Sequence, residues 1–241
     1  MDKKNLFIII GGIALLFIVG LSLWYFGFVN IEKINEDAVK FKEEYENYNG
    51  SKAFGEYTYQ ELEISEDSKI NYASVDEVIE LLEDGTGLIY LGFPTCPWCR
   101  GLIPALLEVV DCSCLENLTY LNVNDLRDTY TLENGKPVKT KDASDEYYKI
   151  LDLLNDYLLD YTLTDEKGKE INVGEKRLYV PMVIAVKDGK IIDTRIDSVT
   201  LDENQSPFDP LTESQHRELK TDFSDMIDQI TKEANVCEDH C

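Results

Sequence analysis

A Cys-Pro-Trp-Cys sequence at residues 96–99 constrains the fold of this chain more than any other feature. It follows the apolar run Gly87–Phe93, which predicts a buried strand, and a helical pattern begins directly after it. At a helix start, unpaired backbone N–H groups and the positive end of the helix dipole face the first sulfur and favour its thiolate. The second sulfur lies one turn further on, where it can form a disulfide with the first. This placement predicts thiol–disulfide chemistry.

Half of a zinc site is the main alternative for a Cys-x-x-Cys pair, and zinc needs four ligands. The sequence has no second Cys-x-x-Cys, and its two histidines are His216 and His240. We therefore favour redox chemistry that needs no metal or other cofactor. A metal-handling protein stays open as an alternative, because five further residues offer ligands: Cys112, Cys114, Cys237, His240 and Cys241.

The charge of the chain excludes one class of partner. Its 241 residues carry a formal net charge of −24 at pH 7. A strongly acidic surface repels phosphate backbones, so we expect no nucleic-acid partner. The length suffices for one sizeable domain with additional segments.

The N-terminal segment predicts a membrane anchor. Residues 6–29 are uncharged and largely apolar, and roughly 20 such residues in a helix cross a bilayer. A cleaved signal peptide is the alternative, but the run exceeds the usual apolar core of roughly 7–15 residues and no A-x-A-like site follows it. Lys3 and Lys4 favour a cytoplasmic N-terminus. We expect a single-pass protein of the cell membrane whose redox domain is extracytoplasmic.

The rest of the chain predicts one folded domain of alternating strands and helices. Ser74 and Glu77 form a capping box for a helix that ends at Gly85. An apolar stripe at helical spacing predicts a helix in the long segment before residue 179, formed by Tyr147, Ile150, Leu151, Leu154, Leu158 and Tyr161. The other expected elements are strands at 56–65 and 118–123, a strand–turn–strand unit at 179–196 with an Asp188-Gly189 turn, and a last helix at 213–235.

Three matches in chain order make this sequence resemble the thioredoxin-like superfamily. The first is strand–Cys-x-x-Cys–helix, the second is Pro104 five residues after Cys99, and the third is Pro181 before a strand–turn–strand unit. The resemblance implies an α/β, thioredoxin-like fold with a helical insertion before the cis-proline strand. The expected organisation is a cytoplasmic tail at 1–4, a transmembrane helix at 5–29, a stalk or leading helix at 30–55, and the thioredoxin-like domain at 56–241 with its insertion at about 125–178.

The resemblance also implies roles for individual residues. Cys96 would attack the substrate and Cys99 would resolve the mixed disulfide. The cis-proline Pro181 would face the active-site disulfide, and the backbone of Val180 would pair with the substrate chain. Thioredoxins carry a buried aspartate six residues before the first cysteine, where this chain has Tyr90. The proton transfer usually given to that aspartate would fall here to Tyr90, to water or to no group.

Two neighbours of the cysteines are further candidates. Trp98 offers an apolar contact surface for substrate, or it only packs on the strand. Arg100 adds positive charge near both sulfurs, or it is a solvated surface residue.

The anchored, acidic, single-domain layout is similar to extracytoplasmic thiol–disulfide oxidoreductases of Gram-positive bacteria, including bacteriocin transport accessory proteins. Val180 before the proline is similar to DsbA-type oxidases, so an oxidase or isomerase is favoured over a reductase. The expected partners are protein or peptide thiols and disulfides, and a membrane redox partner or transporter. The alternative is a redox-inactive accessory module that binds a transporter, with Cys96 and Cys99 as a static disulfide.

The four remaining cysteines stand near the ends of two helices. In thioredoxin-like folds these helices lie on the same face of the sheet. The resemblance therefore allows structural disulfides between the pair Cys112 and Cys114 and the pair Cys237 and Cys241, which would fit an oxidising compartment.

Overall fold

The computed structural model describes residues 34–231. The expected tail and transmembrane helix, together with Cys237, His240 and Cys241, lie outside this range. Within it, no helix combines the length and the apolar character that crossing a bilayer requires. The fold described below belongs to one compact unit, which begins at Asn35.

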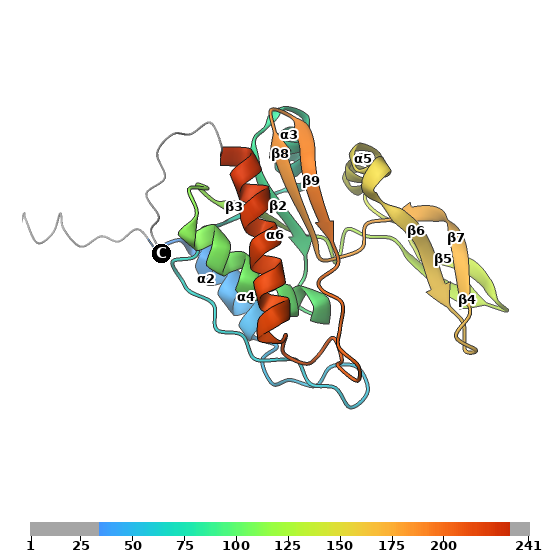
Figure 1. The fold of residues 1–241 in the computed structure, drawn as a ribbon. Helices are drawn as coiled ribbons and strands as arrows, with labels where there is room; N and C mark the ends of the chain where they lie inside the picture. Colours follow the sequence, from blue (N-terminus) through green and yellow to red (C-terminus); the bar gives the residue numbers. More distant parts are fainter. Residues whose placement is uncertain (1–33, 232–241) are drawn as a thin grey trace, which may run out of the picture. The chain divides into compact units, whose positions relative to one another are not determined.

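A five-stranded mixed sheet forms the centre of this unit (Figure 1). Its strand order is β1-β3-β2-β8-β9, with β2 in the middle. The first three strands run parallel, whereas β8 pairs antiparallel with both β2 and β9. The strands are β1 Ile70–Tyr72, β2 Gly87–Gly92, β3 Leu118–Asn122, β8 Met182–Lys187 and β9 Lys190–Ile196.

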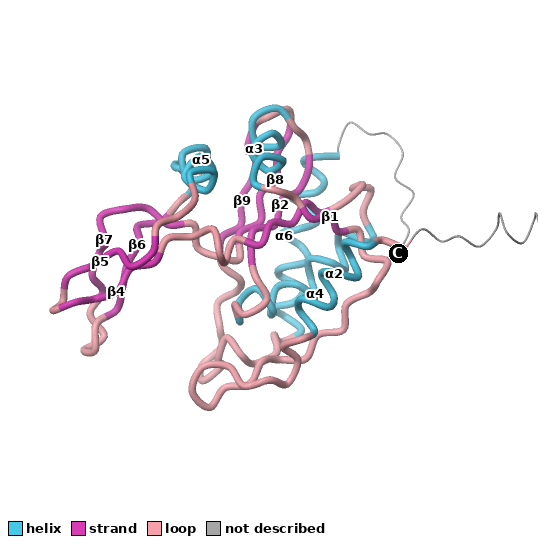
Figure 2. Tube along the Cα trace, turned by 180° about the vertical axis from the view of Figure 1, so that it is seen from behind, coloured by secondary structure: helices cyan, strands magenta, loops and turns pink. Residues whose placement is uncertain are grey.

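Helices cover both faces of the sheet (Figures 1 and 2). On β2, Leu88 and Tyr90 point into one core cluster with α2, α4 and α6, while Ile89 and Leu91 point into the other with α3 and α5. A strand that is apolar on both faces is therefore buried on both, as its sequence predicts. The helices of the described part are α2 Glu36–Glu46, α3 Val75–Asp84, α4 Pro97–Cys112, α5 Asp145–Leu153 and α6 Glu213–Thr231.

Several local predictions are confirmed. Ser74 caps α3, and its capping box with Glu77 is complete. The Asp188-Gly189 turn joins β8 to β9 with positive φ at both residues, 50° and 67°. Gly189 is required there for a second reason, because a Cβ atom would overlap the carbonyl oxygen of Glu83.

The strand expected at 56–65 is wrong. Apart from an isolated bridge between Lys52 and Thr58, this segment forms no strand. Leu62 and Ile64 are buried in the core whereas Tyr57 is exposed, and the backbone of the segment bonds to side chains near the end of α2. The amide of Ile64 donates to Glu46 over 2.7 Å, and that of Leu62 donates to Asn49 over 3.0 Å. These side chains take the place of a neighbouring strand.

The inserted segment, residues 125–178, contains less helix than its apolar stripe predicts. The stripe continues to Tyr161, but α5 ends at Leu153 because the following residues form a 3-10 turn and then a strand. Tyr161 is buried from that strand instead. The rest of the segment consists of two hairpins, formed by β4 Thr129–Glu133 with β5 Lys136–Lys141 and by β6 Leu159–Thr164 with β7 Glu170–Arg177.

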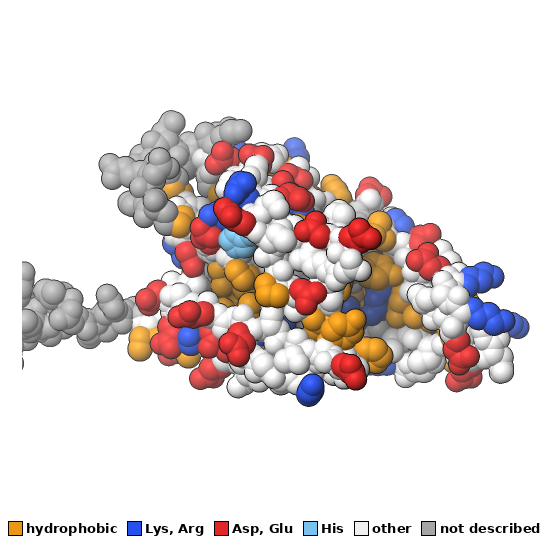
Figure 3. Space-filling view, turned by 60° about the horizontal axis from the view of Figure 1, so that its bottom comes forward, with side chains coloured by type: hydrophobic (Ala, Val, Ile, Leu, Met, Phe, Trp, Pro, Cys, Tyr) orange, Lys and Arg blue, Asp and Glu red, His pale blue; other side chains and the backbone are white. Residues whose placement is uncertain are grey.

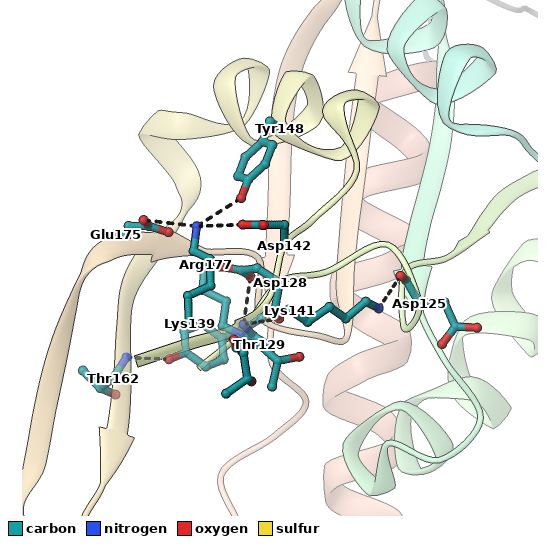
Figure 4. Close-up of polar contacts among 12 residues, drawn as sticks. Asp125, Asp128, Thr129, Lys139, Lys141, Asp142, Tyr148, Thr162, Glu175 and Arg177 are labelled. Carbon is teal, nitrogen blue, oxygen red and sulfur yellow. Dashed lines mark hydrogen bonds and ion pairs between the residues drawn. The ribbon is translucent and has the colours of Figure 1, made fainter. Parts of the chain in front are cut away.

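Polar contacts join the parts of the inserted segment (Figure 4). Lys139 on β5 lies 3.5 Å from the carboxylate of Glu175 on β7 and 3.8 Å from that of Asp142. The same ammonium group donates to the hydroxyl of Tyr148 on α5 over 3.3 Å. One side chain thus connects both hairpins and the helix.

Arg100 on α4 is a fully buried cation that holds the N-terminal part of the domain to the helix. One terminal nitrogen donates to the carbonyl of Tyr45 over 2.7 Å. The other donates to Asn49 over 2.6 Å and to the carbonyl of Gln60 over 2.7 Å. Because a buried carbonyl without a donor is costly, Arg100 ties α2 and the irregular segment after it to the core.

Replacing Arg100 tests this interpretation. Arg100→Met removes the charged hydrogen bonds to Tyr45, Asn49 and Gln60 from the interior, so we expect the free energy of unfolding to fall by about 3–5 kcal/mol. Arg217→Met is the matched control, because Arg217 is exposed and only pairs with Glu213 on the same helix. Its effect should stay within about 0.5 kcal/mol. Urea denaturation followed by circular dichroism measures both, and equal effects would contradict the bracing role.

Candidate functional site

The two cysteines lie where the central strand β2 passes into α4. The amide of Cys96 donates to the carbonyl of Phe93 over 3.2 Å, which closes the turn after the strand. Cys96 has an extended backbone and is the N-cap of α4, and Pro97 occupies the first turn. The Cys96 sulfur accepts the Cys99 amide N–H at 3.4 Å, as a serine or threonine oxygen does at other N-caps. This local geometry follows the sequence prediction.

The two thiols differ in exposure and in acidity. Cys96 is 6% exposed and Cys99 is fully buried, and both are free thiols. The hydrogen bond with the Cys99 thiol, the backbone N–H groups of Cys99 and Trp98, and the charge of Arg127 together lower the pKa of Cys96, although burial opposes them. Burial, and then the adjacent Cys96, raise the pKa of Cys99 well above its ordinary value. Cys96 is therefore the thiol that ionises first.

The start of β8 faces the Cys96 sulfur. The Val180–Pro181 peptide bond is cis, as the resemblance implies, and the Cys96 thiol donates to the Val180 carbonyl over 3.6 Å. Val180 itself is partly exposed, so a chain lying across Cys96 also reaches this backbone. Trp98 is partly buried and packs against the core cluster of α4, with part of its surface still open.

Tyr90 lies beneath the site, fully buried on β2. Its hydroxyl lowers the pKa of the Cys99 thiol, against the effect of burial, and lies 2.8 Å from the hydroxyl of Tyr45 on α2. Burial raises the pKa of Tyr90 well above its usual value, so the hydroxyl stays protonated and can donate. The Tyr90 hydroxyl can occupy this place only because residue 92 is glycine, since a Cβ atom on residue 92 would overlap the hydroxyl.

Two residues of the site were missed by sequence reasoning. Tyr45 belongs to an irregular apolar stripe, which gives no indication that its hydroxyl reaches a tyrosine 45 positions later. Arg127 stands in the loop after β3, and its guanidinium lies over the ring of Phe93 at 4.6 Å. The only sequence hint was a basic residue soon after the carboxyl end of a strand that pairs with β2, because such ends meet at one edge of a parallel sheet.

Arg100 is not the solvated surface residue that one sequence interpretation allowed. It is fully buried, and its guanidinium points to the carbonyls of Tyr45, Pro94 and Gln60. Its place is therefore within the structural framework of the site.

The remaining cysteines divide at the limit of the described chain. Cys112 and Cys114, at the end of α4, are disulfide-bonded. Cys237 and Cys241 lie outside the described residues, so the pairing between the two ends stays a prediction. No group of three or more metal-ligating side chains occurs within residues 34–231, and the metal-handling alternative involves residues beyond them.

Comparisons with known proteins returned no family model, no curated protein and no solved structure that matches this chain.

The asymmetry of the two thiols is directly testable. Iodoacetamide reacts with thiolates, and a lowered pKa moves that reaction to lower pH. At about pH 7 we expect the reduced protein to be labelled first at Cys96, at least tenfold faster than at Cys99, whose raised pKa and burial keep it protonated. Peptide mass spectrometry of timed samples gives both rates. Equal rates in the folded protein would contradict the assignment, and urea-unfolded protein, where both should react alike, is the control.

Proposed function

We propose that this chain is a thioredoxin-like thiol–disulfide oxidoreductase that acts on cysteines of extracytoplasmic proteins. The observation that carries the proposal is the pairing of an acidic, nearly buried Cys96 with a protonated, fully buried Cys99, next to the cis-proline at the start of β8. The mixed sheet, with a helix starting at the first cysteine, supports the thioredoxin-like assignment.

The proposed reaction exchanges sulfur–sulfur bonds and electrons only between the two cysteines and the substrate. The Cys96 thiolate attacks one sulfur of a substrate disulfide, so that a Cys96–substrate bond forms, the substrate disulfide breaks, and the leaving thiolate takes a proton from water. Cys99 then gives its proton to water, and its thiolate attacks the Cys96 sulfur. This forms the Cys96–Cys99 disulfide, releases the second substrate thiolate and moves two electrons to the substrate. The oxidative direction reverses the same steps.

Tyr90 has a defined place in the second step. Cys99 must ionise inside the protein, where burial opposes a negative charge. The Tyr90 hydroxyl donates to this sulfur and lowers its pKa relative to burial alone. The hydroxyl of Tyr45 stays in contact with that of Tyr90. In this proposal Tyr90 stabilises the Cys99 thiolate as it forms, in the position where thioredoxins carry an aspartate.

The direction of electron flow and the location of the protein in the cell are part of the same proposal. A lowered pKa of Cys96 stabilises the reduced site, which makes the protein an oxidant, so we favour an oxidase or isomerase over a reductase. Residues 5–29 would anchor the chain in the cell membrane, with the N-terminus in the cytoplasm and the redox domain outside. Its substrates would be protein or peptide thiols and disulfides, and its partner would be a membrane redox protein or a transporter.

Single cysteine variants test the proposal. We expect Cys99→Ala to accumulate a mixed disulfide with a disulfide-containing protein such as insulin, because Cys96 attacks and no thiol resolves it. Cys96→Ser should form none, since the buried Cys99 does not reach the substrate. Non-reducing electrophoresis and mass spectrometry detect the adduct. If folded Cys99→Ala formed no adduct while the wild-type protein also left insulin disulfides intact, the chain would be a redox-inactive binding module.

A further inference from the structure

Arg127 is held in a fixed place at the start of the inserted segment. On one side, the amide of Val123 donates to the carbonyl of Gly92 over 3.2 Å, which extends the pairing between β3 and the end of β2. On the other side, the carbonyl of Leu126 accepts from Ser144, also at 3.2 Å. Asp128 is buried and lies 3.3 Å from a guanidinium nitrogen of Arg177 (Figure 4). The chain on both sides of Arg127 is therefore held in place by these contacts.

The guanidinium of Arg127 lies beside the turn that presents Cys96. It stacks over Phe93 at 4.6 Å, and the carbonyl of the same Phe93 accepts the amide of Cys96. Its Nε is buried and has no hydrogen-bond partner. A cation that stacks on a ring and leaves a donor unused is available to an anion at that position.

The charges around Arg127 leave a positive excess. Asp128 pairs with Arg177, whose guanidinium also stacks on the ring of Tyr161. This carboxylate therefore offsets the charge of Arg177 and leaves that of Arg127 in excess. Burial lowers the pKa of Arg127, and so does the nearby Arg177, whereas Cys96 and Cys99 raise it. Figure 3 turns the lower end of Figure 1 toward the reader, and Lys or Arg side chains lie there in a hollow between hydrophobic ones. This excess is unusual in a chain with a net charge of −24.

We propose that Arg127 is the counter-cation of the Cys96 thiolate, so that the inserted segment, together with the helix start, holds the reactive sulfur as an anion. The inference rests on the proposed function, because it concerns the same sulfur. It gives Arg127 an electrostatic role in the proposed reaction, through the effect of its charge on the attacking sulfur. The insertion then contributes to the chemistry as well as to the surface around it.

Other groups also act on Cys96 and must be separated from Arg127. On α4 these are the Cys99 thiol and the first backbone N–H groups. On the segment before β1, Tyr59 interacts electrostatically with Cys96, and its hydroxyl donates to the carbonyl of Thr95 over 3.2 Å. Arg127 is faced by Arg177 on β7 and by Tyr147 on α5. Replacing only Arg127 leaves the α4 groups and Tyr59 in place, so any change in the ionisation of Cys96 reports the guanidinium.

The test measures the ionisation of Cys96 in the full chain. The rate of Cys96 alkylation by iodoacetamide, mapped by mass spectrometry, is followed from pH 4 to 10. Arg127→Met should move the midpoint upward and reduce the thiolate fraction roughly tenfold at a pH below both midpoints. Arg127→Lys keeps the charge and should restore most of the thiolate fraction that Arg127→Met loses. Lys190→Met removes a charge at the start of β9, opposite the end of β8 that is far from Cys96, and should leave the midpoint unchanged.

A second variant moves the charge the other way. Asp128→Asn removes the carboxylate that offsets Arg177, so the net charge near Arg127 becomes more positive and the Cys96 midpoint should fall. This variant decides the matter if Arg127→Met does not fold. An unchanged midpoint in folded Arg127→Met, or an unchanged or higher one in Asp128→Asn, would overturn the proposal. The readout needs no substrate, so a chain that exchanges no disulfide but shows these shifts would refute the proposed function alone.

Discussion

The hydrogen bond from the Cys99 amide to the Cys96 sulfur, 3.4 Å long, is the interaction on which the candidate site depends. It makes a cysteine the N-cap of α4, so the first orphan amides of the helix stabilise a sulfur anion. The bond requires that α4 begin directly after β2, in the middle of the sheet. Because β2 is apolar on both faces and covered on both, its end is fixed, and so is the position of the sulfur.

Around this bond, burial sorts the polar groups into two roles. Arg100 is buried and bonded to neutral carbonyls, so its charge is used to hold α2 and the following segment against α4. Tyr90 is equally buried, but its hydroxyl acts on the Cys99 thiol and lowers the pKa of that group against the effect of burial. The difference lies in what each group faces. A buried donor that faces a carbonyl stabilises the fold, whereas one that faces a titratable sulfur also changes its chemistry.

How much could be read from the sequence depended on whether a feature is local. The strand, the cap and the helix around Cys96 follow from periodicity and helix-start chemistry, which act within a few residues. The segment 56–65 has a strand-like pattern, yet its amides bond to Asn49 and Glu46 instead. The stripe that ends at Tyr161 crosses from a helix into a strand without losing its apolar positions. Tyr45 reaches the site only through tertiary packing, for which one sequence contains no pattern, and for Arg127 the sequence offers only its place after the carboxyl end of β3.

The reduction potential of the Cys96–Cys99 pair tests the central claim most directly, because it reports whether this environment stabilises the reduced site. The full chain is equilibrated in glutathione buffers of defined ratio, quenched with acid, and analysed by mass spectrometry for the Cys96–Cys99 disulfide. The account predicts a reversible two-electron transition at a potential above about −200 mV. A transition near about −270 mV, or no Cys96–Cys99 disulfide at any ratio, would contradict it.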